Sequence, residues 1–224
     1  MEAEKKENIT VPDNADINNI KNNNNIKKLW ENAKGHLKTI NEHKRLVMEH
    51  CFRVGLYKQG LLHDLSKYSP AEFITGIKYY QGDKSPNAAE REEKGKSEAW
   101  LHHKGRNKHH YEYWIDYPGR GQDIAGMEMP VRYVVEMFCD RVAACKVYNK
   151  EKYTDSDALN YYKKGRAHYV IHPKSDRLLK YMLEMLSAKG EDYTFDYIRR
   201  KILKNKKRKK EEKIKYSRSQ RIAK

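Results

Sequence analysis

Residues 60–67 read Gly-Leu-Leu-His-Asp-Leu-Ser-Lys, so that an apolar run ends in the adjacent pair His63 and Asp64. Burying an imidazole and a carboxylate at an apolar helix end is costly unless a partner satisfies both groups. A divalent transition metal is such a partner, because neutral imidazole and carboxylate are its usual nitrogen and oxygen ligands. The alternative is that Asp64 accepts hydrogen bonds from the loop near Ser66 while His63 packs. The pair is therefore the first candidate metal site in the sequence.

The sequence around this stretch has the period of an all-α protein. Apolar residues recur at helical spacing almost everywhere, and no convincing run of strict alternation predicts a strand. Ser69-Pro70 is a strong helix start, and Glu72 stands where a capping box needs a carboxylate. We predict helices over residues 26–55, 56–65, 70–80, 86–103, 131–148 and 175–188, with others after the cap at 154–157 and from Thr194 into the C-terminal tail.

The two ends of the chain differ in composition from its middle. Residues 1–25 are rich in asparagine and hold few apolar side chains, so we predict that they are disordered. Residues 26–198 form the predicted helical domain. Residues 199–224 carry 14 Lys and Arg against 2 Glu, which is +12 of the chain's formal net charge of +16. We predict a helical or disordered tail that supplies most of the basicity.

Residues 204–224 of this tail have two interpretations. They could bind nucleic acid without sequence preference through contacts between their cations and the phosphates. The alternative is a solvated extension of the last helix. No aromatic side chains are interleaved with the cations of residues 204–210, so the sequence does not support specific recognition of bases.

The sequence also predicts the compartment of the protein. Residues 1–5 do not open a signal peptide, because no apolar run follows the charges. No segment approaches the roughly 20 apolar residues that a membrane span needs. Cys51, Cys139 and Cys145 form no C-x-x-C motif and have apolar neighbours, which indicates small core residues in a reducing environment. We predict a cytoplasmic protein without a membrane span.

Three histidines lie on one side of the first predicted helix. His36, His43 and His50 are spaced by seven residues, which separates neighbours by about 10 Å of helix rise. Only one of them can therefore reach a given metal centre. For each histidine alone, the alternative is a hydrogen-bonded residue between packed helices.

A second cluster of histidines and cations occupies residues 102–110. Four histidines within nine positions are hard to explain as core packing. If they face the site, they could hold a second metal or donate to a phosphate, while the cations attract an anionic substrate. The alternative is a solvated basic loop. The members are His102, His103, His109 and His110, with Lys104, Arg106 and Lys108 between them.

Asp140 places a carboxylate in the most apolar predicted helix, residues 131–148. Both faces of this helix are largely apolar, which is typical of a central helix. A buried carboxylate needs a partner, and the candidates are a metal and Arg141. Asp140 is thus a further candidate ligand.

This order of residues resembles the HD-domain metal-dependent phosphohydrolase superfamily: a helix histidine, an adjacent His-Asp pair, further histidines and a helical Asp. The run at 60–67, with a lysine three positions after Asp64, is similar to its signature. Three longer runs resemble a bacterial and phage family of unknown function: GLLHDLSKYSPAEF at 60–73, AWLHHKGRNKHHYEYW at 99–114 and CDRVAACKVY at 139–148. The resemblance implies a single HD-like helical domain over residues 26–198.

By position, the resemblance implies that His63, Asp64 and Asp140 ligate a divalent transition metal, which would be Mn, Fe, Co, Ni or Zn. We expect the first ligand to be His43, because core residues follow it at helical spacing, and His50 is the alternative. The histidines of residues 102–110 match the region where two-metal members place additional ligands. One or two ions are therefore expected, and which of the four histidines bind stays open.

The resemblance implies hydrolysis of a small anionic phosphorylated substrate, a nucleotide or another phosphoester. The metal would lower the pKa of a bound water and polarise a phosphoryl oxygen. Asp64 would orient the nucleophile or bridge two metals. Lys67, Lys104 and Arg106 would offset the developing negative charge.

Two other functions remain open from the sequence. Some HD-like folds hold two irons and activate oxygen, with the same types of ligand. The third interpretation is a non-catalytic nucleic-acid-associated protein that uses its basic tail and ignores His63 and Asp64. A resemblance of fold is an analogy, so the reaction must be argued from the site.

Overall fold

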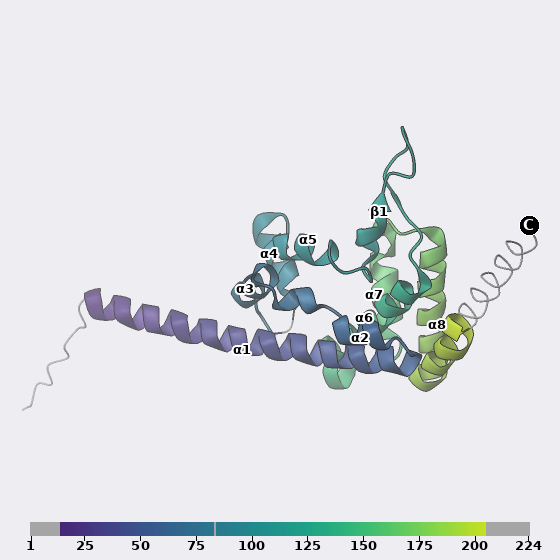
Figure 1. The fold of residues 1–224 in the computed structure, drawn as a ribbon. Helices are drawn as coiled ribbons and strands as arrows, with labels where there is room; N and C mark the ends of the chain where they lie inside the picture. Colours follow the sequence, from purple (N-terminus) through teal and green to yellow (C-terminus); the bar gives the residue numbers. More distant parts are fainter. Residues whose placement is uncertain (1–13, 83, 205–224) are drawn as a thin grey trace, which may run out of the picture.

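The protein is helical, as predicted, with a short hairpin of two-residue strands. The computed structural model describes residues 14–82 and 84–204 (Figure 1). The α-helices are α1 (Asn14–Val54), α2 (Tyr57–Leu62), α3 (Pro70–Lys78), α4 (Pro86–Lys94), α5 (Glu98–Lys104), α6 (Val131–Asn149), α7 (Asp157–Gly165) and α8 (Pro173–Tyr197). The short elements are the 3-10 helices η1 (Leu65–Tyr68), η2 (Tyr111–Trp114), η3 (Lys150–Lys152) and η4 (Arg166–His168), the π-helix η5 (Ile198–Leu203), and β1 (Ile115–Asp116) paired antiparallel with β2 (Ala125–Gly126). None of the described helices is long and apolar enough to cross a membrane.

The hydrophobic core lies where α1, α6 and α8 meet. The last turns of α1 bury Val47, Cys51 and Val54 at the spacing that predicted this helix face. From α6, Phe138 and Val142 are fully buried against them. Burying a large apolar side chain stabilises the fold by about 1.5–3 kcal/mol. Core packing therefore holds these long helices, and the side chains on them, in fixed positions.

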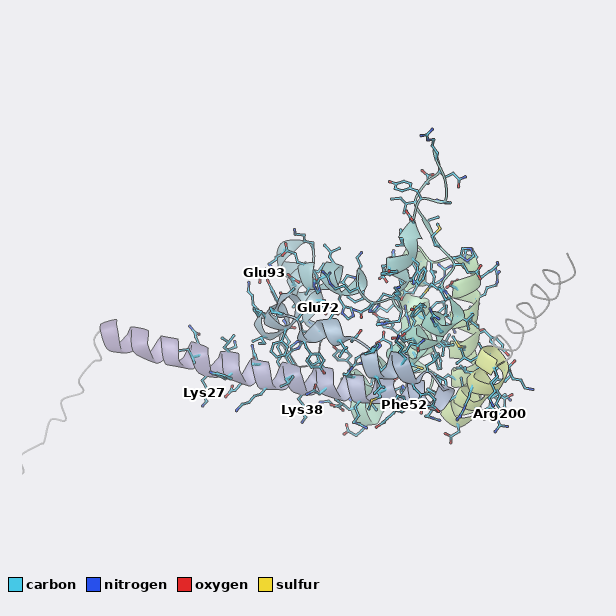
Figure 2. All side chains as sticks on the ribbon, viewed as in Figure 1. Lys27, Lys38, Phe52, Glu72, Glu93 and Arg200 are labelled. Atoms are coloured by element: carbon cyan, nitrogen blue, oxygen red, sulfur yellow. The ribbon has the colours of Figure 1, made fainter. Side chains whose placement is uncertain are left out.

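Helix α1 is longer than predicted. It begins at Asn14, so residues 14–25, which we predicted to be disordered, are helical. Extending an existing helix is far easier than nucleating one, which lets the asparagine-rich run continue the amphipathic part. The N-terminal part of α1 projects beyond the other helices in Figure 1, and Lys27 lies on this projection in Figure 2. Residues 1–13, also predicted to be disordered, lie outside the described residues.

The His-Asp pair lies in a turn, whereas we predicted that it ends a helix over residues 56–65. Helix α2 stops at Leu62, and η1 begins at Leu65. Between them Asp64 takes a left-handed backbone conformation with φ 53° and ψ 29°. Such conformations cost about 1–3 kcal/mol in residues other than glycine and cluster at functional sites. The backbone conformation alone therefore marks Asp64 as a candidate functional residue.

Residues 86–103 form two helices, so the prediction of one continuous helix is wrong. Gly95 has φ 72° and ends α4, with its N–H donating to the carbonyl of Arg91. A glycine in this conformation is a common helix stop, because it lacks the Cβ that would clash. The hydroxyl of Ser97 then accepts from Trp100 N at 3.0 Å and caps α5. The break allows α5 to leave the direction of α4.

The last long helix is interrupted at Gly190, as predicted, and the chain continues in helical form beyond it. Gly190, with φ 75° and ψ 176°, interrupts α8 where we predicted that a helix ends. The chain continues through η5, and Ile198 of this element is fully buried in the core. Ile202 and Leu203 of η5 are partly buried and also pack against the core, so contacts with the core reach beyond Ile198. Residues 205–224, with most of the tail predicted to contact nucleic acid, lie outside the described residues.

Candidate metal centre

Seven side chains with metal-binding atoms converge from different parts of the fold. They form two groups, and within each group the candidate ligand atoms all lie within 4.8 Å of one another. The members are His43 on α1, His63 and Asp64 in the turn after α2, His103 on α5, His109 and His110 before η2, and Asp140 on α6. Asp64 belongs to both groups. These buried and half-buried residues are positioned so that they could hold a metal ion.

The first group consists of His43, His63, Asp64 and Asp140. His43 Nε2 lies 2.9 Å from Asp140 Oδ1 and 3.9 Å from Asp64 Oδ2. His63 Nε2 lies 3.4 Å from Asp64 Oδ2 and 3.5 Å from Asp140 Oδ1. Two imidazole nitrogens and two carboxylate oxygens thus face a common point, and this donor set suits a first-row transition metal.

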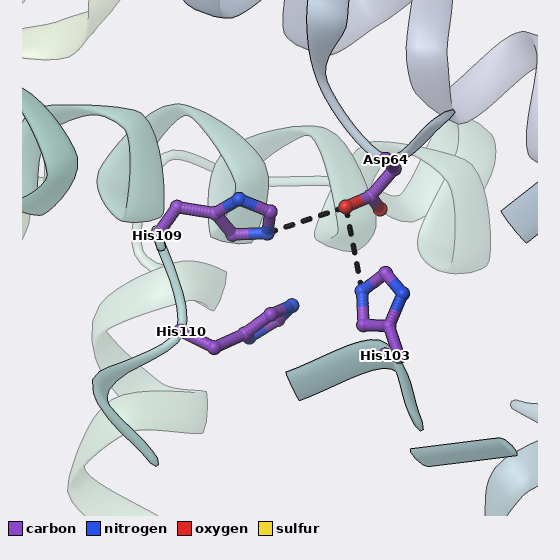
Figure 3. Close-up of side chains that lie close together, drawn as sticks. All are labelled: Asp64, His103, His109 and His110. Carbon is purple, nitrogen blue, oxygen red and sulfur yellow. Dashed lines mark ion pairs between the residues drawn. The ribbon is translucent and has the colours of Figure 1, made fainter. Parts of the chain in front are cut away.

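The second group consists of Asp64, His103, His109 and His110, and Figure 3 shows their rings directed toward one space. His103 Nε2 lies 3.3 Å and His109 Nε2 lies 3.4 Å from the same oxygen, Asp64 Oδ1. The ring of His110 lies between them. This group offers three imidazoles and one carboxylate, which is also a transition-metal donor set.

Asp64 faces the two groups with different oxygens. Its Oδ2 is the atom near His43 and His63, and its Oδ1 is the atom near His103 and His109. A carboxylate with one oxygen in each group has the arrangement of a bridge between two ions.

Most of the facing atoms are buried without a hydrogen-bond partner among the described residues. An unpaired buried polar atom costs about 1–3 kcal/mol, and folded proteins contain few of them. Lys67 Nζ forms an ion pair with Asp64 Oδ2 at 2.7 Å, without hydrogen-bond geometry. A metal ion would satisfy the rest, and the donor atoms of either group fit one. The unpaired atoms at the centre are Nε2 of His43, His63, His109 and His110 and both carboxylate oxygens of Asp64.

Two buried glutamates hold the opposite edges of the imidazole rings. Glu136 Oε1 lies 3.1 Å from Nδ1 of His63 and 3.3 Å from Nδ1 of His109. Glu72 Oε2 lies 2.8 Å from Nδ1 of His103. A carboxylate at Nδ1 fixes the tautomer that leaves Nε2 free for a metal. The close group of His63, His109 and Glu136 is therefore the outer layer of this centre.

Sequence reasoning missed both glutamates. We interpreted Glu72 as half of a capping box with Ser69, which is wrong, because the Ser69 side chain makes no capping hydrogen bond and the Glu72 carboxylate binds histidines. Glu136 lies four residues before Asp140 on α6 and so shares its face. That spacing was a usable signal, because a second carboxylate in the most apolar helix also requires a buried partner.

The structure does not bring every predicted site residue into the two groups. His102 belongs to neither, and its Nδ1 lies 2.6 Å from Glu72 Oε1. Lys104 is half-buried and Arg106 is exposed, and in the described part of the chain neither forms an ion pair with the groups. Lys67 does contact the centre through Asp64, and its side chain is 28% exposed. It is thus the predicted cation that lies between the centre and solvent.

The other two histidines of α1 have partners outside the centre. His50 Nδ1 lies 3.3 Å from the carbonyl oxygen of Cys139, and its ring packs against Phe195. His36 is buried between α1 and α3, with its ring near Phe73. Of the two histidines considered as the first ligand, the structure therefore places His43 at the centre and His50 in the core.

Asp140 has histidine partners and not the arginine that was its alternative partner. Its Oδ1 faces His43 and His63, whereas the Arg141 guanidinium lies over the ring of Tyr169. Neighbouring residues on a helix point about 100° apart, so Arg141 is directed elsewhere. The Asp140 side chain is 16% exposed, which places it at the edge of the centre.

Burial and mutual contact set the protonation of the metal-free centre. Burial and the nearby lysine charge lower the pKa of His43, and burial and the adjacent histidines lower that of His110 well below its usual value. Burial raises the pKa of Asp64 and Asp140, but contacts with His63 and other cationic groups outweigh it and hold both carboxyls well below their usual range. Burial lowers the pKa of His63, but the nearby Asp64 carboxylate outweighs this effect and raises that pKa well above the ordinary value. Metal binding must therefore release the His63 proton.

Comparison with known proteins assigns the chain to a family but not to a reaction. Residues 32–185 match the model of a family of unknown function, DUF5662, so the chain belongs to this family. The match spans the candidate ligands from His43 to Asp140. Neither the comparison with curated proteins nor the comparison with solved structures gave a match.

Proposed function

We propose that this protein is an HD-type metal-dependent phosphohydrolase that acts on a nucleotide or another small phosphoester through a two-metal centre. The observation that carries the proposal is the position of Asp64, with one carboxylate oxygen in each of two histidine groups. A bridged pair of metal ions is a recurrent device for displacement at phosphorus, because it can hold both the attacking and the leaving oxygen. The HD resemblance of the sequence supports the same class.

The donor sets favour transition metals over Mg²⁺ or Ca²⁺. The first group offers two nitrogens and two oxygens, and the second offers three nitrogens and one oxygen. Imidazole suits Fe, Ni and Zn, Co lies between Fe and Ni in the order of affinities, and the carboxylates also suit Mn, whereas Mg²⁺ and Ca²⁺ favour ligand sets made of oxygen. We propose one ion in each group, chosen from these five metals.

The protein's own residues prepare a site for an anion beside the ions. The bound ions would supply an activated water and Lewis acidity toward a phosphoryl oxygen. Lys67, whose side chain is 28% exposed, carries a positive charge beside the buried Asp64, where it would bind a phosphoryl oxygen and offset developing charge. Lys104 and Arg106 would add longer-range attraction for the substrate.

Metal content and hydrolysis, measured together, test this function. The wild type, purified without a histidine tag or chelator, should bind two equivalents of metal by mass spectrometry and cleave phosphoesters from a substrate panel. Asp64→Ala should lose both metal and activity. His50→Gln is the matched control, because His50 is equally buried on α1 but faces the Cys139 carbonyl, and it should keep both.

Other results would overturn the proposal. A protein that binds no metal after reconstitution would have no such centre, and the basic tail would become the candidate for function. Two bound irons with a visible absorption band, O₂ consumption and no phosphoester cleavage would indicate an oxygenase of the same ligand type.

A further inference from the structure

Glu136 occupies a distinctive position beneath the two groups. It is buried on α6, one turn before Asp140, at 5% relative exposure. A single oxygen, Oε1, lies 3.1 Å from His63 Nδ1 and 3.3 Å from His109 Nδ1. His63 belongs to the first group only, and His109 belongs to the second group only. Glu136 therefore contacts one candidate ligand of each ion.

Glu136 Oε1 is hydrogen-bonded to Nδ1 of His63 and lies within ion-pair distance of Nδ1 of His109. A carboxylate only accepts, so Nδ1 of His63 carries the donated proton, and the negative charge beside Nδ1 of His109 favours a proton at the same position there. Once His63 has released its second proton, the lone pair of each ring is at Nε2, and both Nε2 atoms are buried without a hydrogen-bond partner and directed toward Asp64. The two rings lie 4.4 Å apart between centroids with an interplanar angle of 35°. One oxygen thus sets the orientation of both rings together.

Glu72 provides the natural comparison within the same molecule. It is also a buried glutamate with two histidine partners, but these are His103, in the second group, and His102, in neither. Glu72 therefore contacts ligands of one ion only. The two glutamates share chemistry and burial and differ in whether they connect the groups.

We propose that Glu136 is a positioning residue that couples the two metal positions, so that each ion is bound in a geometry that favours the other. Asp64 would join the ions directly, and Glu136 would join them from the opposite edges of the His63 and His109 rings. Its charge would also raise the basicity of both imidazoles and so strengthen both metal bonds. This inference rests on the proposed two-metal centre and concerns how that centre is assembled.

Metal titration of isosteric variants tests the coupling. Co²⁺ binding to the metal-free protein, followed by calorimetry and by its visible absorption, gives both affinities without any assay of activity. In Glu136→Gln both affinities should fall by about 10- to 100-fold, the usual effect of losing an outer carboxylate. In Glu72→Gln only one affinity should fall, because His103 is the only candidate ligand among the partners of Glu72 and His102 belongs to neither group. His103→Ala identifies which of the two affinities belongs to the second group.

The outcomes separate this inference from the function on which it rests. If the wild type binds two Co²⁺ and Glu136→Gln weakens only one of them, Glu136 serves one ion and the coupling is refuted. If Glu136→Gln leaves both affinities unchanged, its role is only to satisfy buried histidines. If the wild type binds no Co²⁺, the proposed centre itself fails. Thermal unfolding in EDTA checks the fold, and Glu136→Ala provides a second variant in which both affinities should fall further.

Discussion

The two halves of the candidate centre are built on different kinds of structure. The first group takes His43 and Asp140 from α1 and α6, long helices that bury core residues such as Cys51 and Val142. The second group takes its histidines from the end of the short helix α5 and the segment that follows it. Side chains on packed helices are held more firmly than those on short connections. We therefore expect the first group to be preformed and to bind its ion more tightly.

The largest expected effect is the loss of metal affinity when one ligand is removed from either group. His43→Ala removes a preformed ligand, and we expect the tighter Co²⁺ affinity to fall by at least about 100-fold. His103→Ala should leave one tightly bound equivalent. Calorimetric titration of both variants checks this, and equal losses in the two would show that the halves do not differ.

A smaller effect is expected from Gly76→Ala, which perturbs α3, the helix that carries the His103 partner Glu72. A Cβ at Gly76 would lie 2.0 Å from Nε2 of the buried His36, so either the His36 ring or α3 must shift. Overpacking of this kind destabilises by about 1–3 kcal/mol. Because α3 also carries Glu72, the weaker metal affinity should fall with it. Denaturant unfolding and metal titration measure both effects.

Gly119→Ala is the control for this substitution. The Cβ that it adds would meet only the side chain of Gln122, at ordinary contact distances of 3.4 Å and beyond. It should change neither stability nor metal affinity. A Gly76→Ala protein that behaves in the same way would contradict the account of the contact between α1 and α3.

Lowering the pH should destabilise the folded, metal-free protein. His36 and His50 are buried on α1, and burial lowers the pKa of each to about 4 from the ordinary 6.5. As pH falls through 6.5 the unfolded chain gains protons that the folded chain does not, so stability falls until pH reaches about 4. Between pH 7 and 5 each histidine should cost about 2 kcal/mol. Unfolding of the metal-free protein at both pH values measures this, and His50→Gln should lose less on acidification than the wild type.

The smallest expected effect is the loss of stability caused by a substitution outside both groups. The Asp157 carboxylate accepts hydrogen bonds from the backbone N–H and the hydroxyl of Thr154 at the start of α7. Asp157→Ala should destabilise the protein by about 1 kcal/mol, as the loss of a helix cap does. Metal affinity should not change. A change in metal binding would mean that the centre responds to global stability rather than to its own supports.

The half built on long helices was also the half that the sequence predicted better. His43 was expected ahead of His50 because core residues follow it at helical spacing, and the structure places His43 beside Asp140. In the second half, His102 and His103 are adjacent in sequence, and only the packed structure shows that His103 faces Asp64 while His102 faces Glu72. Spacing along a helix identifies a face, but a short helix offers too few turns to orient that face.

One of the remaining differences is local, and the others depend on tertiary contacts. The helix predicted over residues 86–103 breaks at Gly95, a local glycine stop that the prediction passed over. Glu72 matched a local capping pattern, and its actual partners lie about 30 residues away on α5. The split of the two Asp64 oxygens between the groups depends on a left-handed turn that no periodicity reveals. Local sequence patterns predicted most of the helices, whereas the contacts between their side chains depend on tertiary packing.

The most direct test of the two-metal centre is a crystal structure of the protein loaded with Mn²⁺, with the ions located by anomalous scattering. We expect two peaks about 3.5–4 Å apart, one bound by each oxygen of Asp64. His43, His63 and Asp140 should surround the first ion, and the histidines of the second group should surround the other. A single peak away from Asp64, or no peak in this region, would contradict the account.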